Sequence, residues 1–168
     1  EYAFVRTSYR GTKTGALAKD PTAAANMKNA AAAGVKVGAY IFSQAITTAE
    51  AVQEAEYLLQ TVKGYKITMP LVFDYEYYSG GRFSSSTKLS RRVKTDICLA
   101  FCDRIRKAGY TPLVYANKSM FSSDLYASEI TAKYPAWLAH YTTSTDYTGD
   151  YDFWQYTSSG RVSGISGN

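Results

Sequence analysis

The amino-acid sequence predicts an α/β fold with a mostly parallel sheet or barrel. Short apolar runs alternate along the chain with segments whose apolar residues recur at helical spacing. Strands that alternate with helices are joined by right-handed crossovers, and such crossovers make neighbouring strands parallel. The chain has 168 residues, of which 46% are hydrophobic, so it can bury the core of one domain.

The first half of the chain contains strands and helices with clear boundary signals. Three strands are expected, at residues 2–8, 35–43 and 71–73. Two helices are expected between them, at residues 20–33 and 47–63, each stopped by a glycine. The first begins at Asp20-Pro21, because aspartate caps helices and proline suits the first turn. The second begins at a capping box, Thr47-x-x-Glu50. A loop rich in Gly, Thr and Lys is expected over residues 10–19.

The second half continues the alternation. Strands are expected at residues 111–117, 136–141 and 152–157. A long helix follows a loop at residues 79–88, and Gly109 ends it. The inward-facing residues of this helix are expected to be Val93, Ile97, Phe101 and Ile105. A short helix is expected over residues 120–133, and Ser158-Ser159-Gly160 is expected to turn the last strand into a hairpin with residues 161–165.

Charge and cysteine content narrow the classes of function. The net charge of +5 suits an anionic partner, such as nucleic acid or a bacterial wall, but mildly basic chains without such partners are common. The basic residues are scattered over helix faces and no nucleic-acid motif accompanies them, so no nucleic-acid partner is expected. Cys98 and Cys102 lie four apart in a helix, where a bridge is unfavourable, and are expected to be buried thiols. With a single His, they make no zinc site, and no metal or cofactor is expected.

The segment Pro70-Leu-Val-Phe-Asp-Tyr-Glu-Tyr-Tyr78 carries two acids at the end of an apolar strand. Side chains alternate along a strand, so Asp74 and Glu76 are expected on one side, with Cα atoms roughly 6–7 Å apart. Two like charges this close raise one pKa, which suits a general acid. Tyr75, Tyr77 and Tyr78 supply rings that stack on sugars. The competing interpretation is an ordinary strand end with two solvated acids.

Residues at the carboxyl ends of the other strands also favour a carbohydrate site. Parallel α/β folds place their sites at these ends. The residues there, besides the acid pair, are Thr7, Ser8, Arg10, Tyr40, Phe42, Gln44, Tyr115, Asn117, His140, Tyr141, Gln155 and Tyr156. This is one acidic pair among aromatic and amide side chains, which favours carbohydrate over phosphate. No phosphate loop, dinucleotide fingerprint or nucleophile elbow follows any strand.

Six segments in order resemble the glycoside hydrolase family 25 lysozymes, which are N,O-diacetylmuramidases. They are Phe4-Val-Arg, Ala33-Gly-Val-Lys-Val-Gly-Ala-Tyr-Ile-Phe-Ser-Gln, Pro70-Leu-Val-Phe-Asp-Tyr-Glu, Ala108-Gly-Tyr-Thr-Pro-Leu-Val-Tyr-Ala-Asn, Trp137-Leu-Ala-His-Tyr and Phe153-Trp-Gln-Tyr-Thr-Ser-Ser-Gly-Arg-Val-Ser-Gly-Ile. The resemblance covers nearly the whole chain. It implies an irregular TIM-like βα barrel of five βα units plus extra strands. It also implies cleavage of the β-1,4 bond from N-acetylmuramic acid to N-acetylglucosamine in peptidoglycan.

The resemblance implies roles for particular residues. Glu76 matches the general acid and Asp74 its partner on the same strand. Because the two share one strand face, we favour substrate assistance, in which Asp74 orients the 2-acetamido group, over a covalent aspartyl enzyme. Substrate-binding residues are expected to be Tyr40, Phe42, Tyr77, Tyr115, Asn117, Trp137, Tyr141 and Gln155. The alternative role of each groove aromatic is to pack the barrel interior. The alternative role of Asn117 is to cap the next turn. His140 is expected to be structural.

The chain also departs from the family pattern. The family begins one strand earlier, with an Asp-containing strand, and places another Asp after its last hairpin. We therefore expect residues 1–168 to be one lysozyme-like catalytic domain that is a fragment, incomplete at both ends. The rival hypothesis is a dead or weak fragment that binds wall glycan without cutting it. Peptidoglycan glycan strands are the expected partner, at a secreted or wall-associated site. Membrane insertion is not expected. If the chain is a fragment, wall-binding domains can be among the parts that it lacks.

Overall fold

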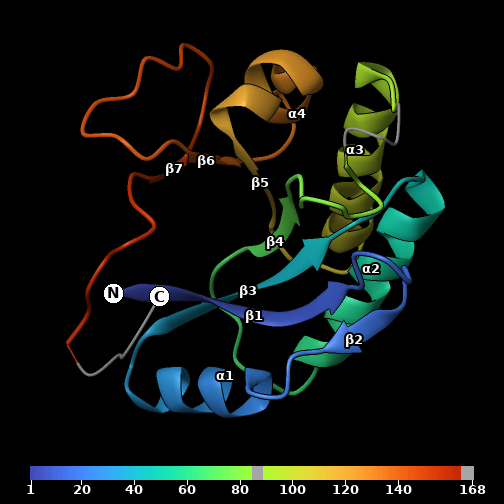
Figure 1. Cartoon of the computed structure of the whole chain (residues 1–168). Helices are drawn as coiled ribbons and strands as arrows, with labels where there is room; N and C mark the ends of the chain where they lie inside the picture. Colours follow the sequence, from blue (N-terminus) through green and yellow to red (C-terminus); the bar gives the residue numbers. More distant parts are fainter. Residues whose placement is uncertain (85–88, 164–168) are drawn as a thin grey trace.

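A single seven-stranded sheet organises the computed structural model, which describes residues 1–84 and 89–163. The strand order is β2-β1-β3-β4-β5-β6-β7 (Figure 1). The strands are β1 (Tyr2–Arg10), β2 (Leu17–Lys19), β3 (Lys36–Ser43), β4 (Leu71–Tyr75), β5 (Pro112–Asn117), β6 (Ala136–Ala139) and β7 (Phe153–Gln155). Every neighbouring pair is parallel except β1 and β2. The predicted α/β class with a mostly parallel sheet is confirmed.

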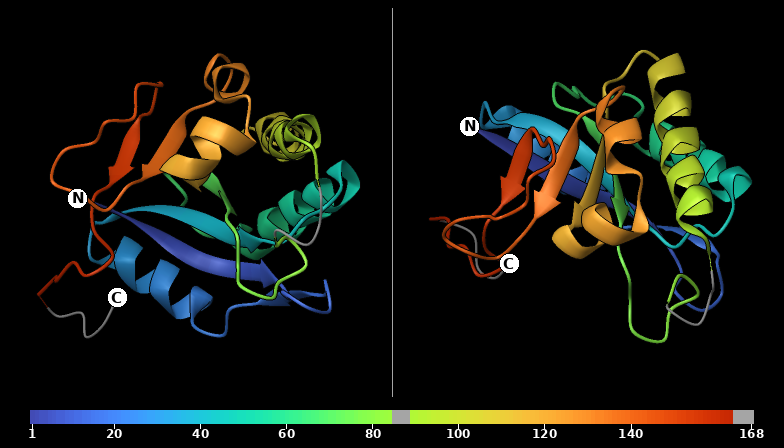
Figure 2. Two further views of the ribbon diagram at one scale, coloured as in Figure 1. Left: turned by 45° about the horizontal axis from the view of Figure 1, so that its top comes forward. Right: turned by 90° about the horizontal axis from the view of Figure 1, so that it is seen from above.

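Helices pack against the outer face of this sheet and form the main core with it. They are α1 (Ala23–Ala32), α2 (Thr48–Val62), α3 (Arg91–Lys107) and the short α4 (Ala127–Thr131), with a π-helical turn η1 (Met120–Asp124). α2 and α3 lie side by side (Figure 2). The hydroxyl of Thr47 accepts from the Glu50 amide at 3.1 Å, as the capping box predicts. The Glu50 carboxylate, however, accepts from the amide of Ile46 rather than that of Thr47.

Several expectations about local structure are wrong. The first helix begins at Ala23 with Thr22 as its N-cap, rather than at Asp20. The predicted loop 10–19 contains β2, which forms because Leu17–Lys19 pairs with the end of β1. The single helix predicted over residues 120–133 is split into η1 and α4. Val93 is 38% exposed rather than facing inward, whereas the rest of its stripe is buried. Residues 161–163 form no strand, and the remainder of the predicted hairpin lies outside the described residues.

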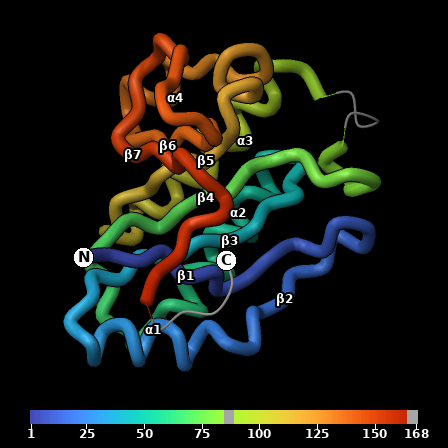
Figure 3. The backbone as a smooth tube through the Cα atoms, turned by 60° about the vertical axis from the view of Figure 1, so that its left-hand side comes forward, coloured from blue at the N-terminus to red at the C-terminus, as the bar shows by residue number. Residues whose placement is uncertain are grey.

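The sheet curves so that its two ends approach each other. In Figure 3 the start of β1 and the strand β7 lie on the same side of the molecule. Ring centroids of Tyr2 and Phe153 are 5.8 Å apart, and those of Phe4 and Trp137 are 4.7 Å apart. These aromatic contacts, from β1 to β6 and β7, line the concave face. The concave face is therefore a small second core, distinct from the one under the helices.

The loop after β4 is fastened to the sheet by packing and charge. The Phe83 ring stacks between those of Tyr75 and Tyr77, with centroid distances of 4.0 and 4.8 Å. The Arg82 guanidinium donates to the Glu50 carboxylate at 2.8 Å. Because Glu76 lies at the start of this loop, these contacts bear on the position of the acid pair.

Candidate active site

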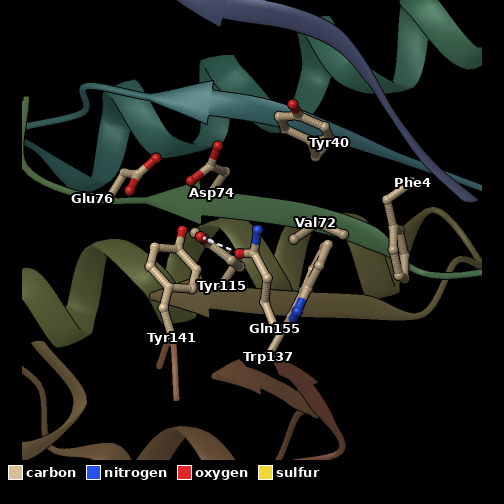
Figure 4. Close-up of a pocket in the computed structure, with 9 residues that line it drawn as sticks. All are labelled: Phe4, Tyr40, Val72, Asp74, Glu76, Tyr115, Trp137, Tyr141 and Gln155. Carbon is tan, nitrogen blue, oxygen red and sulfur yellow. Dashed lines mark hydrogen bonds between the residues drawn. The ribbon is translucent and has the colours of Figure 1, made fainter. Parts of the chain in front are cut away.

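A cavity of about 340 Å³ lies on the concave face and extends from the early residues of β1, β4 and β6 to the carboxyl ends of the strands. Its volume falls in the range of small-molecule sites. The acid pair stands at one end and the aromatic rings of β1 and β6 at the other (Figure 4). The cavity is lined by Phe4, Tyr40, Val72, Asp74, Glu76, Tyr115, Trp137, Tyr141 and Gln155.

Strand β4 positions the acid pair. Asp74 lies within the strand and is 8% exposed, whereas Glu76 is the first residue after it and is partly buried. Their side chains point into the same cavity (Figure 4). A hydrogen bond between the two carboxyl groups contributes to the pKa of each. Such a bond between two carboxyl groups requires a proton on one of them. The bond raises the pKa of Asp74 and lowers that of Glu76, so Asp74 is the donor and Glu76 the acceptor.

Burial and mutual repulsion explain why this proton is retained. Burial, followed by the charge of Glu76, raises the pKa of Asp74 well above its usual range, and Arg6 opposes this rise. Burial also raises the pKa of Glu76, although the hydrogen bond from Asp74 opposes it. One oxygen of Asp74, Oδ1, is buried and has no partner among the described residues. This unpaired oxygen adds to the cost of an ionised Asp74 and so favours its protonated form.

Two tyrosine hydroxyls face the acid pair from neighbouring strands. Tyr40 lies on β3, and burial, aided by the charge of Asp74, raises its pKa to about 12. Tyr115 lies opposite Asp74 on β5, and its hydroxyl donates to the Gln155 side-chain oxygen at 2.7 Å (Figure 4). Burial and a hydrogen bond with Tyr141 raise the pKa of Tyr115 as well. These hydroxyls remain neutral, so they offer hydrogen bonds rather than charge.

Phe4 and Val72 line the cavity but were absent from the predicted site. Phe4 packs beside Trp137, and together they form an apolar wall (Figure 4). Val72 lies two residues before Asp74 on β4 and is paired with Tyr40 across the sheet. The alternation of side chains would have placed Val72 on the face of Asp74. Phe4 could not have been placed in this way, because a bulge between Arg6 and Ser8 breaks the alternation along β1.

A second depression, of about 430 Å³, continues the cavity beyond Glu76. It shares Glu76, Tyr115 and Tyr141 with the first cavity, and its other lining residues are Asn117, Lys118, Ser119, Ala139 and His140. The Asn117 side-chain oxygen accepts from the amide of Met120 at 2.9 Å, so it caps the next turn. The His140 imidazole is hydrogen-bonded to the Thr145 hydroxyl at 2.8 Å. Open space therefore lies on both sides of Glu76.

Two predicted substrate-binding residues lie outside both cavities. The Phe42 ring contacts that of Tyr78, with centroids 6.3 Å apart. The Tyr77 ring stacks on Phe83, and its hydroxyl donates to Asp124 at 3.1 Å and accepts from Lys94 at 2.8 Å. The structure thus places Tyr77 in the packing of the loop. Alternation fails for Tyr77 because β4 ends at Tyr75.

Other features of the described chain bear on the sequence expectations. Cys98 and Cys102 are free and fully buried, as predicted. Within residues 1–84 and 89–163, no cluster of three or more His, Cys, Asp or Glu side chains is arranged to hold a metal ion. Over the same ranges, no helix combines the length and apolar character that a membrane crossing requires.

Comparisons with known proteins identify the family of this chain. The model of the family "Glycosyl hydrolases family 25" matches residues 5–165. Lysozyme M1 of Streptomyces globisporus is 29% identical over 160 residues, which cover 89% of this chain and 53% of that protein. Across eight curated relatives, the chain spans between 28% and 56% of the relative's length.

Solved structures give the same result. The bacterial lysozyme from Streptomyces coelicolor superimposes with a TM-score of 0.79 at 27% identity, over 99% of this chain and 77% of that one. The autolysin LytC from Streptococcus pneumoniae, in complex with a synthetic peptidoglycan ligand, has a TM-score of 0.78 at 26% identity. It is matched over 98% of this chain and 38% of its own. The barrel-like βα fold of these structures confirms the predicted fold class. The family match spans almost the whole sequence, and the chain therefore belongs to glycosyl hydrolase family 25.

Proposed function

We propose that this chain is a peptidoglycan hydrolase that cleaves the β-1,4 bond between N-acetylmuramic acid and N-acetylglucosamine. The observation that carries the proposal is the buried, proton-sharing pair of Asp74 and Glu76 in an aromatic-walled cavity. Family membership, the lysozyme names of its relatives and the peptidoglycan ligand of LytC support it. A glycan strand of the bacterial wall is the partner, and the site of action is the wall.

Glu76 acts as the general acid. It stands where the two cavities meet, so a glycosidic oxygen between two bound sugars comes within its reach. Glu76 donates its proton to that oxygen as the bond from the anomeric carbon breaks. Afterwards the Glu76 carboxylate takes a proton from the water that completes hydrolysis. The raised pKa of Glu76 supports the first step, because the acid must be protonated before the bond breaks.

Asp74 orients the 2-acetamido group. In retaining enzymes with a carboxylate nucleophile, the two carboxyl groups stand about 5–5.5 Å apart and flank the bond. Here the two share a hydrogen bond and belong to one strand end, so Asp74 is on the same side as the acid. The acetamido oxygen attacks the anomeric carbon instead, and the Asp74 carboxyl group, which lines the cavity, accepts from the acetamido N–H. As that N–H approaches, the shared proton moves from Asp74 to Glu76.

The aromatic wall holds the sugar beside the pair. Trp137 and Phe4 present apolar surface to the cavity, and the neutral hydroxyls of Tyr40 and Tyr115 face its interior. Rings of this kind bind the apolar faces of sugars, while hydroxyl and amide groups bind their edges. Tyr141 is 55% exposed and contributes to both cavities, so it contacts the sugars on either side of the cleaved bond.

Analysis of the products from purified peptidoglycan tests the proposal. The chain is incubated with wall material, the new reducing ends are reduced with borohydride, and the hydrolysate is analysed for amino sugars. Muramicitol is expected. Glucosaminitol, or new amino groups from cut peptides, would mean that a different bond is cleaved. No new ends, with the chain still retained on the wall material, would establish the rival function of a glycan-binding fragment.

A further inference from the structure

The ladder between β3 and β4 ends one residue before the proposed acid. The last paired residues are Ser43 and Tyr75, so Gln44 would be opposite Glu76 if the ladder continued. Instead, the Gln44 side-chain amide donates to the backbone oxygen of Glu76 at 3.3 Å and to that of Ser43 at 2.9 Å. A side chain thus takes the place of the next backbone pairing. Glu76 is tied to the sheet although it lies beyond the strand.

The other end of the same side chain holds the far part of the loop. The Gln44 oxygen accepts from the backbone amide of Phe83 at 3.3 Å, and the residue is fully buried. A Cβ added at Gly81 would lie only 2.7 Å from this oxygen, so the loop wraps closely around it. Gln44 therefore fixes both the first residue of the loop and its return toward the core.

We propose that Gln44 is a positioning residue for the general acid. Gln44 lines neither cavity. Its hydrogen bond to Glu76 is made to the backbone and not to the carboxyl group, so it acts through the position of that residue. The hydrogen bond between Glu76 and Asp74 requires their carboxyl groups to keep a fixed separation. Loss of the Gln44 contacts would let the backbone of Glu76 shift, and a displacement of about 1 Å lowers turnover by as much as 10²-fold. This inference rests on the proposed role of Glu76.

Two variants separate positioning from general stability. Gln44→Met keeps the length of the side chain but removes all three hydrogen bonds. Gly81→Ala keeps the Gln44 side chain, but the added methyl group would crowd its oxygen. The control is Thr95→Val. The Thr95 side chain is fully buried and its hydroxyl bonds the backbone of Arg91 and Tyr126, in a region away from the cavities.

The experiment measures kcat and KM on soluble peptidoglycan fragments together with the melting temperature. Gln44→Met and Gly81→Ala are expected to lower kcat at least tenfold with little change in KM, because the sugar-contacting rings are untouched. Thr95→Val is expected to lower the melting temperature while kcat stays the same. If Gln44→Met does not fold, Gly81→Ala decides the question.

The outcomes distinguish this inference from the proposed function. An active wild-type chain whose kcat is unchanged in the variants that fold would overturn the positioning role alone. The positioning role would also be overturned if Thr95→Val lowered kcat as much as Gln44→Met at an equal loss of melting temperature. The fall in kcat would then reflect lost stability only. A wild-type chain without turnover would overturn the proposed function, and the role of Gln44 with it.

Discussion

Replacement of Arg10 by Met should destabilise the protein in a pH-dependent manner. The Arg10 guanidinium is 5% exposed and donates to the Glu54 carboxylate at 2.6 Å, to the Gly15 carbonyl at 2.8 Å and to the Glu50 carbonyl at 3.0 Å. The side chain of Glu54 is completely buried. Removal of one partner from a buried ion pair costs about 3–5 kcal/mol, because the other charge is left unpaired. We expect Arg10→Met to lower the free energy of unfolding toward this amount at alkaline pH, where Glu54 is ionised in the wild-type protein, and by less at lower pH.

The pKa of Glu54 sets the direction of the pH dependence. Burial raises this pKa to about 7, against the opposing hydrogen bonds from Ser43 and Arg10. A glutamate in the unfolded chain has a pKa of about 4.3. The contribution of Glu54 to the free energy of unfolding is therefore lost as the pH rises from that value to about 7. Without Arg10 the folded pKa is higher still, and the loss continues above pH 7 at about 1.4 kcal/mol per pH unit. The cost of the substitution should therefore be larger at pH 8.5 than at pH 5.5.

Urea unfolding, followed by tryptophan fluorescence at the two pH values, measures this cost. The matched control is Arg92→Met, which removes exposed ion pairs with Asp96 and Glu129. Exposed pairs contribute about 0–1 kcal/mol, so this control should change little at either pH. An equal cost of Arg10→Met at pH 5.5 and 8.5 would refute the reasoning, because it would mean that Glu54 does not titrate between them.

Three further predictions concern the cavity. Asp74→Asn should lower kcat on the order of 10²-fold, because orientation of the acetamido group is lost; steady-state assays on acetamido-bearing glycan measure it, and an unchanged kcat would exclude substrate assistance. Tyr115→Phe removes the 2.7 Å bond to Gln155 and should cost about 1 kcal/mol of unfolding free energy and raise KM, as urea titration and kinetics would show. Because burial raises the pKa of Glu76, the pH–rate profile should fall at a higher pH than the ordinary glutamate pKa of about 4.3 would give, and a fall centred on that ordinary value would contradict its burial.

Much of the fold was predictable because local and global preferences agree. The apolar runs of β3, β4 and β5 are bounded by turn residues, and the helices between them carry glycine stops. β2 was not predictable, since three residues in a Gly- and Lys-rich segment become a strand only by pairing with β1. The split at residues 120–133 also depends on tertiary contacts, among them the bond from the Met120 amide to Asn117.

Alternation along the strands explains only part of the candidate site. Glu76 and Tyr141 line it from beyond the ends of β4 and β6, whereas Phe42 of β3 lies outside both cavities. Asp74, Tyr40 and Tyr115 lie within regular strands, and the structure brings them together. Tyr77 and Asn117 lie at or beyond strand ends, where the alternation of side chains no longer predicts which way a side chain points. The Tyr77 hydroxyl is hydrogen-bonded to Asp124 on η1 and Lys94 on α3, and Asn117 accepts from the Met120 amide at the start of η1. The contact of Gln44 with Glu76 joins residues 32 positions apart and has no signature in the sequence.

The most direct test of the central claim, that Glu76 supplies the proton, compares two acid-to-amide variants with the wild-type chain. Glu76→Gln keeps the shape of the side chain and removes its proton. Glu129→Gln makes the same change at an exposed residue that pairs with Arg92. Release of reducing muramic acid ends from purified peptidoglycan, and retention on it, are measured for all three chains. We predict that Glu76→Gln binds but releases nothing, while Glu129→Gln matches the wild-type chain; equal release by Glu76→Gln would contradict the account.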